Sequence, residues 1–136
     1  MNWVRGSTLI SKNPETLRSK YGAQIIHQSW KSETIPKAHK DHVLSWSKYH
    51  PEALHVLWTD EDNDSLISTH YPQYQKTYDQ LVLTIQRCDL VRVLYLHRYG
   101  GVYADLDYEA HQNIFEHLPE QTDVMIVESP VLLNET

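Results

Sequence analysis

The chain has 136 residues, 40% of them hydrophobic, and its 12 basic and 18 acidic side chains give a formal net charge of −6. This length allows one domain with a real core and is too short for two. The acidic balance argues against the basic surface that nucleic-acid binders show, so we expect no nucleic-acid partner.

The compartment is predicted from cysteine usage and from hydropathy. Cys88 is the only cysteine, so an internal disulfide is excluded and no oxidising compartment is implied. No apolar run reaches membrane-spanning length, and the start does not resemble a signal peptide. We therefore expect a soluble, cytoplasmic protein rather than one of the Golgi membrane.

The first half of the chain predicts a parallel sheet. Residues 1–21 are polar and suggest a weakly ordered lead-in or a short helix over 14–20, before a domain that we expect over 22–136. Residues 24–28 predict a strand, 36–49 a helix and 53–59 a second strand. A strand, a helix and a strand in this order form a βαβ unit, which implies parallel pairing. His39 and His42 have no further Cys or His cluster beside them, and we expect them at the surface.

An acidic run over residues 60–64 follows the second strand. It resembles the start of a calcium loop, but Ser65 stands where glycine is needed and Tyr71 where glutamate is needed, which excludes that interpretation. We expect Asp60 to cap a helix over 61–69, with the other acids favoured by its positive end. Because Asp60 follows a strand, it could also lie near a bound ligand.

A longer helix is predicted over residues 84–99, where Ile85, Cys88, Val91 and Tyr95 recur at core-facing spacing. Cys88 is interpreted as a small core residue. The double glycine at 100–101 ends the helix, because glycine readily takes a positive φ. A short strand over 102–107 follows, then a helix over 112–118 and a strand over 124–127.

Two acids end the strand over 102–107. Asp105 and Asp107 are two apart, so their side chains point to the same side of an extended chain. Two carboxylates at one point favour a hard cation, and Mg²⁺ or Mn²⁺ held this way takes its other ligands from water and phosphates. The alternative is a solvated, inert acidic loop. Asp89 and Arg92 share one helix face and could approach this point, or could form only a surface ion pair.

Three stretches together carry a family resemblance. They are Arg87-x-Asp89-x-x-Arg92 continued by Leu94-Tyr95 and Tyr99-Gly100-Gly101-Val102-Tyr103-x-Asp105-x-Asp107; Ile25-Ile26-His27-Gln28-Ser29-Trp30-Lys31; and Trp58-Thr59-Asp60-Glu61-Asp62. The pattern resembles the DxD-containing glycosyltransferases of family 32, which include yeast-type α-mannosyltransferases and inositol-phosphorylceramide mannosyltransferases. The resemblance runs from about residue 24 to residue 128.

The resemblance implies a fold and an activity. The fold would be the α/β, Rossmann-like glycosyltransferase A type, with a mostly parallel sheet and flanking helices. The activity would be metal-dependent transfer of a hexose such as mannose, galactose or glucose, with retained anomeric configuration. The donor would be UDP- or GDP-linked and the acceptor a glycan or a lipid.

The resemblance also implies roles for individual residues. Trp30 would stack on the nucleobase, the alternative being a core aromatic. Asp89 and Arg92 would contact the ribose or the sugar, and Tyr103 and Asp105 would line the nucleotide. Asp105 and Asp107 would bind Mn²⁺ or Mg²⁺, with Asp107 the firmer ligand. No catalytic residue is predicted.

Family members normally continue well past the equivalent of Thr136, so the chain resembles a donor-binding half that is truncated at its C-terminus. A second chain could then supply the acceptor half. One alternative is a non-catalytic module that binds a nucleotide sugar or a metal. Another is a phosphatase of the haloacid dehalogenase type. The phosphatase motif needs a long apolar strand before Asp105, and Glu109 stands where it usually has Thr or Val.

Overall fold

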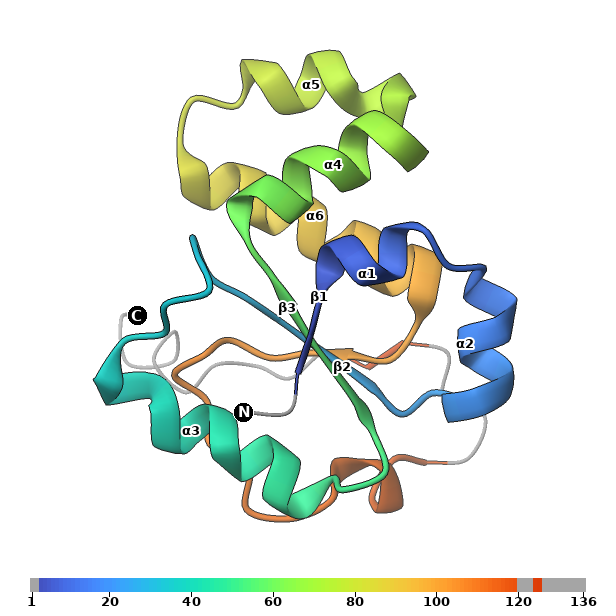
Figure 1. Cartoon of the computed structure of the whole chain (residues 1–136), viewed down its shortest axis with the longest axis vertical. Coiled ribbons are helices and arrows are strands. Elements are labelled where there is room, and N and C mark those ends of the chain that lie inside the picture. Colours follow the sequence, from blue (N-terminus) through green and yellow to red (C-terminus); the bar gives the residue numbers. More distant parts are fainter. Residues whose placement is uncertain (1–2, 120–123, 126–136) are drawn as a thin grey trace.

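The computed structural model describes residues 3–119 and 124–125 (Figure 1). Four parallel strands form one sheet in the order β1-β3-β2-β4. The strands are β1 (Val4–Arg5), β2 (Ile25–Ser29), β3 (Leu54–Trp58) and β4 (Val102–Tyr103). The predicted α/β class with a parallel sheet is confirmed.

Helices surround this sheet on both faces (Figure 1). They are α1 (Gly6–Ile10), α2 (Pro14–Tyr21), α3 (Lys37–Tyr49), α4 (Asp60–His70), α5 (Gln75–Gln80) and α6 (Thr84–Tyr99). Two 3₁₀ turns, η1 (Pro72–Tyr74) and η2 (Ile114–Glu116), complete the described elements. The predicted helices over 14–20, 36–49, 61–69 and 84–99 are therefore confirmed within a residue or two.

The two faces of the sheet bury different side chains, because neighbours along a strand point to opposite sides. Ile25 and Trp58 face a core that α1, α2, α4 and α6 complete. Ile26 and Leu57 face the opposite side, towards α3 and the segment after β4. Both faces are covered, which is usual for a parallel sheet.

The N-terminal residues are part of the fold and are not a loosely ordered lead-in. β1 pairs with β3, and Leu9 of α1 is fully buried. Gly6 packs so closely on Trp58 that a Cβ at this position would overlap the indole ring. Periodicity did not reveal these elements because a strand of two residues and a helix of five are too short to show any.

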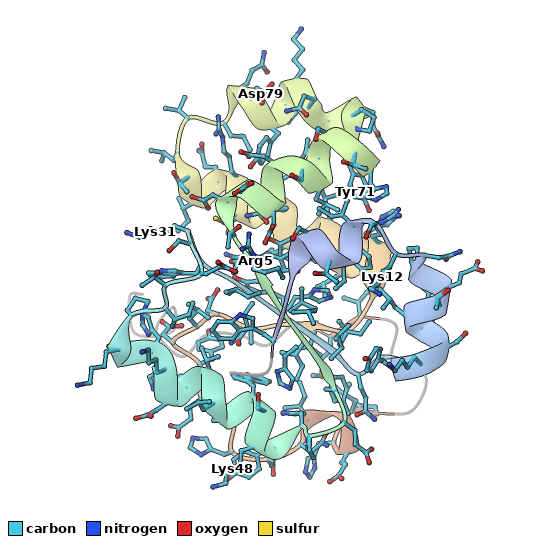
Figure 2. All side chains as sticks on the ribbon, in the orientation of Figure 1. Arg5, Lys12, Lys31, Lys48, Tyr71 and Asp79 are labelled. Carbon is cyan, nitrogen blue, oxygen red and sulfur yellow. The ribbon has the colours of Figure 1, made fainter. Side chains whose placement is uncertain are left out.

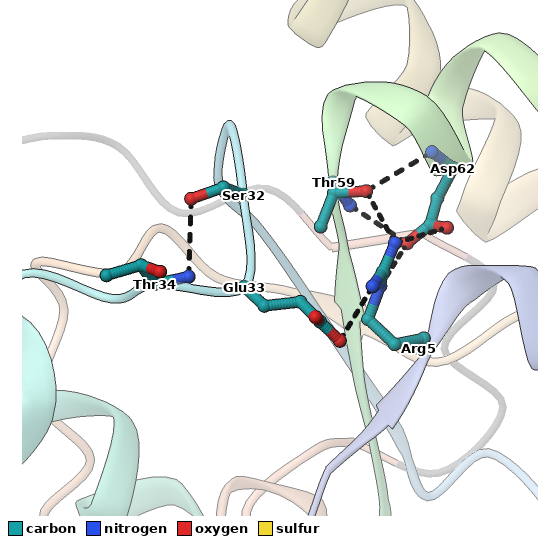
Figure 3. Close-up of polar contacts among 6 residues, drawn as sticks. All are labelled: Arg5, Ser32, Glu33, Thr34, Thr59 and Asp62. Carbon is teal, nitrogen blue, oxygen red and sulfur yellow. Dashed lines mark hydrogen bonds and ion pairs between the residues drawn. The ribbon is translucent and has the colours of Figure 1, made fainter.

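Arg5, at the end of β1, links three parts of the chain (Figure 3). Its guanidinium donates to both carboxylate oxygens of Asp62 at 2.8 and 2.9 Å and to the Thr59 hydroxyl at 2.9 Å. It also pairs with Glu33, in the loop after β2, at 2.7 Å. Burial opposes ionisation of Asp62, but the bonds from Arg5 hold the pKa of this carboxyl below its usual value.

Two local predictions for the helices were wrong. Thr59, not Asp60, caps α4, in a capping box in which the Thr59 and Asp62 side chains bond each other's backbone N–H groups. Ile85 is 65% exposed and therefore does not face the core. Cys88 is half-buried, while Val91 and Tyr95 are buried as expected.

The C-terminal predictions are met in part. The helix predicted over 112–118 is only the 3₁₀ turn η2. Val124 and Met125 are exposed and belong to no strand, and the rest of the strand predicted over 124–127 lies outside the described residues. Among the helices of residues 3–119 and 124–125, none is long and apolar enough to cross a membrane.

The double glycine brings β4 against β2. Gly100 and Gly101 both have positive φ, at 73° and 95°, as predicted, and a Cβ on Gly101 would overlap the carbonyl oxygen of Ile25. Trp58 Nε1–H donates to His27 Nδ1 at 3.0 Å, so His27 Nε2 carries the proton and donates to the Gly100 carbonyl at 2.9 Å. β4 is thereby held beside the first half of β2.

Candidate functional site

A cavity of about 610 Å³ lies where β2, β3 and β4 end and α6 begins, a volume typical of small-ligand sites. Parallel strands place their carboxyl ends at one edge of the sheet, which is where open α/β sheets bind ligands. All six residues named from the sequence line this cavity. The full lining is Ser29, Trp30, Lys31, His39, Asp60, Thr84, Ile85, Cys88, Asp89, Arg92, Tyr103, Asp105, Leu106 and Asp107.

Arg92 stands at the centre of the polar part of the cavity. Its Nη2 lies 3.1 Å from Asp89 Oδ1 and 3.9 Å from Asp105 Oδ1. The guanidinium also lies over the Tyr103 ring, 4.6 Å from its centroid. The pair of Asp89 and Arg92 is therefore more than an isolated surface ion pair, because Arg92 connects α6 with the segment after β4.

Tyr103 fixes the orientation of Asp105. Its hydroxyl donates to Asp105 Oδ1 at 3.0 Å and lies 3.0 Å from Ser29 Oγ, which can donate to it in turn. Burial first, and the nearby Asp105 charge next, raise the pKa of Tyr103 to about 12, against the opposing effect of the bond with Ser29. Tyr103 is thus a neutral donor at physiological pH.

The two acids of the DxD motif have different surroundings. Asp105 already has Arg92 and Tyr103 as partners, whereas Asp107 is exposed at the same cavity. Within the described part of the chain, no group of three or more His, Cys, Asp or Glu side chains could hold a metal. Asp105 and Asp107 nevertheless suit a cation that takes most of its ligands from water and phosphate, because both carboxylates reach one open cavity.

Trp30 is neither fully exposed nor fully buried. It packs partly against the core cluster of Ile35, Val43, Leu57 and Leu106, and it also lines the cavity. Its ring meets the His39 ring edge-on, with centroids 5.7 Å apart. His39 therefore lies at the cavity and half-buried, so the prediction that it is a plain surface residue was wrong, and His42 is half-buried too.

The sequence did not indicate a role at the site for several residues that line the cavity, and Ile85 and Cys88 among them were predicted to face the core. Ser29 is the last residue of β2 and Lys31 follows the strand, one on each side of Trp30 in the sequence, and Ile85 and Cys88 lie on the first turns of α6. Burial first, and then the carboxylate of Asp60, raise the pKa of the Cys88 thiol, so it lines the cavity as a neutral group. Their position at the carboxyl end of β2 was the one available signal for Ser29 and Lys31.

Comparison with known proteins gives the decisive observation. The family model described as glycosyltransferase sugar-binding region containing DXD motif matches residues 36–127, which include α3 to α6, β4 and both DxD acids. The chain belongs to this family of glycosyltransferases. The resemblance to family 32 is thereby confirmed, and the parallel α/β sheet is that of a glycosyltransferase A-type fold.

Several curated relatives of this chain are named as mannosyltransferases or as synthases of a mannosylated lipid. Inositol phosphoceramide mannosyltransferase 3 of Schizosaccharomyces pombe is 40% identical over 91 residues, 67% of this chain and 26% of the relative. A mannosyl phosphorylinositol ceramide synthase of Saccharomyces cerevisiae is 39% identical over 62% of this chain and 22% of the relative. The initiation-specific alpha-1,6-mannosyltransferase of Candida albicans is 32% identical over 65% of this chain and 25% of the relative.

The match covers only part of these proteins. The chain spans about a quarter of the length of these three relatives. No solved structure matches it.

Proposed function

We propose that this chain is the donor-binding part of a metal-dependent glycosyltransferase that moves a hexose from a UDP- or GDP-linked donor to a glycan or lipid acceptor. The anomeric configuration would be retained, as the family resemblance implies. The observation that supports this most is the cavity, where an aromatic ring, an arginine flanked by two acids and the DxD carboxylates converge.

The cavity residues would divide the donor between them. Trp30 would stack on the base, and Asp89 and Arg92 would hold the ribose or the transferred sugar through charge-assisted hydrogen bonds. Tyr103 and Asp105 would line the nucleotide. Lys31, which also lines the cavity, offers a second cation for a diphosphate.

Asp107 and Asp105 are the residues that would hold Mn²⁺ or Mg²⁺. When bound, the cation would offset the negative charge that develops on the departing nucleoside diphosphate. The chain's own contribution is orientation, because Tyr103 and Arg92 fix the Asp105 carboxylate while Asp107 is left exposed for ligation.

The acceptor follows from the names of the relatives, several of which refer to an inositol phosphoceramide or a mannosyl phosphorylinositol ceramide. A lipid acceptor of this kind, or a glycan, is therefore proposed. Further polypeptide, in this chain's natural context or as a second chain, would complete the acceptor side. The cytoplasmic location remains a prediction from cysteine usage, hydropathy and the sequence of the N-terminus.

A calorimetric screen of UDP- and GDP-sugars with Mn²⁺ tests the donor assignment, with transfer and donor hydrolysis as the second readout. We expect one nucleotide class to bind clearly, and Asp107→Asn to weaken that binding. Asp41→Asn is the matched control, since Asp41 is an exposed acid on α3 outside the cavity. Binding without any turnover would favour a non-catalytic nucleotide-sugar module, and no binding at all would contradict the proposal.

A further inference from the structure

The Asp107 carboxylate depends on the backbone for its position. Asp105 has Arg92 and Tyr103 as side-chain partners, whereas no residue in the described part of the chain bonds to the exposed Asp107 side chain. A side chain that binds a metal has to be held within about 0.5 Å of its productive position. Whatever fixes the backbone around Asp107 therefore decides how well this carboxylate can serve a cation.

Asp107 lies in a tight turn that runs from Asp105 to Tyr108. The Tyr108 N–H donates to the Asp105 carbonyl at 3.1 Å, so Leu106 and Asp107 occupy the two central positions of the turn. Leu106 is buried in the core cluster that Trp30 also contacts, whereas Asp107 is exposed at the cavity. The turn thus buries one central side chain and presents the next one to the cavity.

Side chains from two other elements hold the two ends of this turn. At its start, Gln28 of β2 donates its Nε2–H to the Asp105 carbonyl at 3.4 Å, and that oxygen can accept this bond beside the one within the turn. At its end, Trp46 of α3 donates its Nε1–H to the Tyr108 carbonyl at 2.9 Å. Both donors are buried, and neither lines the cavity. They therefore contact the turn from its inner side.

Trp46 is itself held in one orientation. Its indole stacks on the His50 ring, with centroids 5.3 Å apart and 17° between the planes. His50 Nδ1–H donates to the Trp46 carbonyl at 2.9 Å, and His50 Nε2 accepts the Ile114 N–H at 3.0 Å. The segment after β4 passes along α3 (Figure 1), while Lys48, also on α3, points away from the rest of the chain (Figure 2). The inner side of α3 therefore holds the backbone that follows the DxD acids.

We propose that Gln28 and Trp46 are positioning residues for Asp107. By holding the two ends of the turn, they keep the Asp107 carboxylate directed at the place of the cation, although neither residue lines the cavity. The inference rests on the proposed function, since it needs Asp107 to bind Mn²⁺ or Mg²⁺. Loss of either bond should therefore weaken the contribution of the cation and leave the contacts between cavity and nucleotide intact.

The affinity of the whole chain for UDP or GDP, measured by calorimetry without and with Mn²⁺, tests this role. The ratio of the two affinities, here called the metal factor, reports how much the cation tightens nucleotide binding. Trp46→Phe removes the indole N–H and keeps a ring that can stack on His50. We expect this variant to lower the metal factor roughly tenfold, the lower end of the range for groups that orient metal ligands. Its nucleotide affinity without Mn²⁺ should stay that of the wild type.

Combination with Asp107→Asn shows whether Trp46 acts through this carboxylate. In the Asp107→Asn background, Trp46→Phe should change the metal factor by less than about twofold. The matched control is Trp3→Phe, because Trp3 packs partly against the core cluster of Leu106 and, within the described chain, donates no bond to the turn. It should keep the metal factor of the wild type. Gln28→Met removes the other donor and should give a smaller loss than Trp46→Phe, because its bond is longer.

Three results would overturn the positioning role alone. They are a wild-type metal factor in both Trp46→Phe and Gln28→Met, an equal loss in Trp3→Phe and Trp46→Phe, and a full tenfold further loss in the Asp107→Asn background. If Trp46→Phe does not fold, Gln28→Met and its combination with Asp107→Asn decide in the same way. A wild type that binds neither nucleotide, or binds it equally with and without Mn²⁺, would overturn the metal-dependent donor site of the proposed function and this inference with it.

Discussion

At the scale of single residues, the polar part of the site is organised around the guanidinium of Arg92. Arg92 touches Asp89, Asp105 and the Tyr103 ring, so three of the predicted donor-binding residues meet at one guanidinium. The sequence predicted this neighbourhood, because spacing places Asp89 and Arg92 on one helix face and the double glycine turns the chain back. It could not predict the bond from Tyr103 to Asp105 or the contact with Ser29, which depend on side-chain rotamers and on the register of β2 and β4.

The pair of Asp89 and Arg92 gives the first prediction. Alanine at either position should weaken binding of the nucleotide sugar by about 1.5–3 kcal/mol, the range for hydrogen bonds to charged groups. The measurement is the rise in melting temperature caused by the nucleotide sugar with Mn²⁺. A matched control is Asp79→Ala, an exposed acid on α5 outside the cavity. If the ligand raises the melting temperature of both cavity variants as much as that of the wild type, the pair does not contact the donor.

Trp30 gives the second prediction. Trp30→Ala should weaken nucleotide binding by about 1–3 kcal/mol, the range for base stacking on an aromatic ring. Because part of the ring packs against the core cluster around Ile35, some loss of stability should accompany the loss of binding. Calorimetric titration with UDP or GDP measures the affinity, and Trp30→Phe should keep most of it. Normal nucleotide affinity in the alanine variant would show that Trp30 is only a core residue.

At the scale of secondary-structure elements, the spacing of apolar residues was sufficient to predict the longer helices and strands. The strands over 54–58 and 25–29 and the long helices are close to their predicted bounds, because alternation and helical spacing act over many residues. The pattern failed where an element is short or where a helix faces a cavity instead of a core. Ile85 repeats at core spacing and yet lines the cavity, so the spacing identified its face of α6 but not what that face contacts.

The junction at Arg5 gives an element-scale prediction. Arg5→Ala would leave the Asp62 carboxylate, which is 2% exposed, without its cation, and should lower the free energy of unfolding by about 3–5 kcal/mol. Glu33→Ala is the control, because Glu33 is exposed and its pair with the same arginine should be worth at most about 1 kcal/mol. Denaturant unfolding of the two variants measures the difference. An equal loss of stability in the two variants would contradict a buried ion pair that links β1 to α4.

At the scale of the whole molecule, one parallel sheet places side chains from distant parts of the chain at one edge. Residues at and just after the carboxyl ends of β2, β3 and β4 meet the start of α6 there, although 78 positions separate Ser29 from Asp107. The βαβ pattern predicted that edge. The strand order β1-β3-β2-β4 could not be predicted, because β1 was not recognised and its pairing with β3 depends on tertiary packing.

The packing of His27 between the sheet and α6 predicts a pH dependence of stability. Burial lowers the pKa of His27 to about 4, against the raising effect of its bond to the Gly100 carbonyl. An unfolded histidine takes up its proton below about pH 6.5, so between pH 6.5 and 4 the unfolded state binds more protons. Stability should therefore fall by about 3 kcal/mol as the pH drops from 6.5 to 4.

The variant His27→Gln isolates this contribution. Its free energy of unfolding, measured with denaturant at several pH values, should fall less steeply over that range than that of the wild type. The comparison of slopes remains valid even if the variant is less stable at every pH. Identical slopes would contradict a neutral, buried His27.

The most direct test of the donor site is a titration of Mn²⁺, followed by electron paramagnetic resonance, with and without UDP or GDP. The chain offers the cation two carboxylates at an open cavity, so most of its ligands must come from water and phosphate. We predict weak Mn²⁺ binding alone, clearly tighter binding with the nucleoside diphosphate, and the largest loss in Asp107→Asn. Equal Mn²⁺ affinity with and without nucleotide would contradict the account.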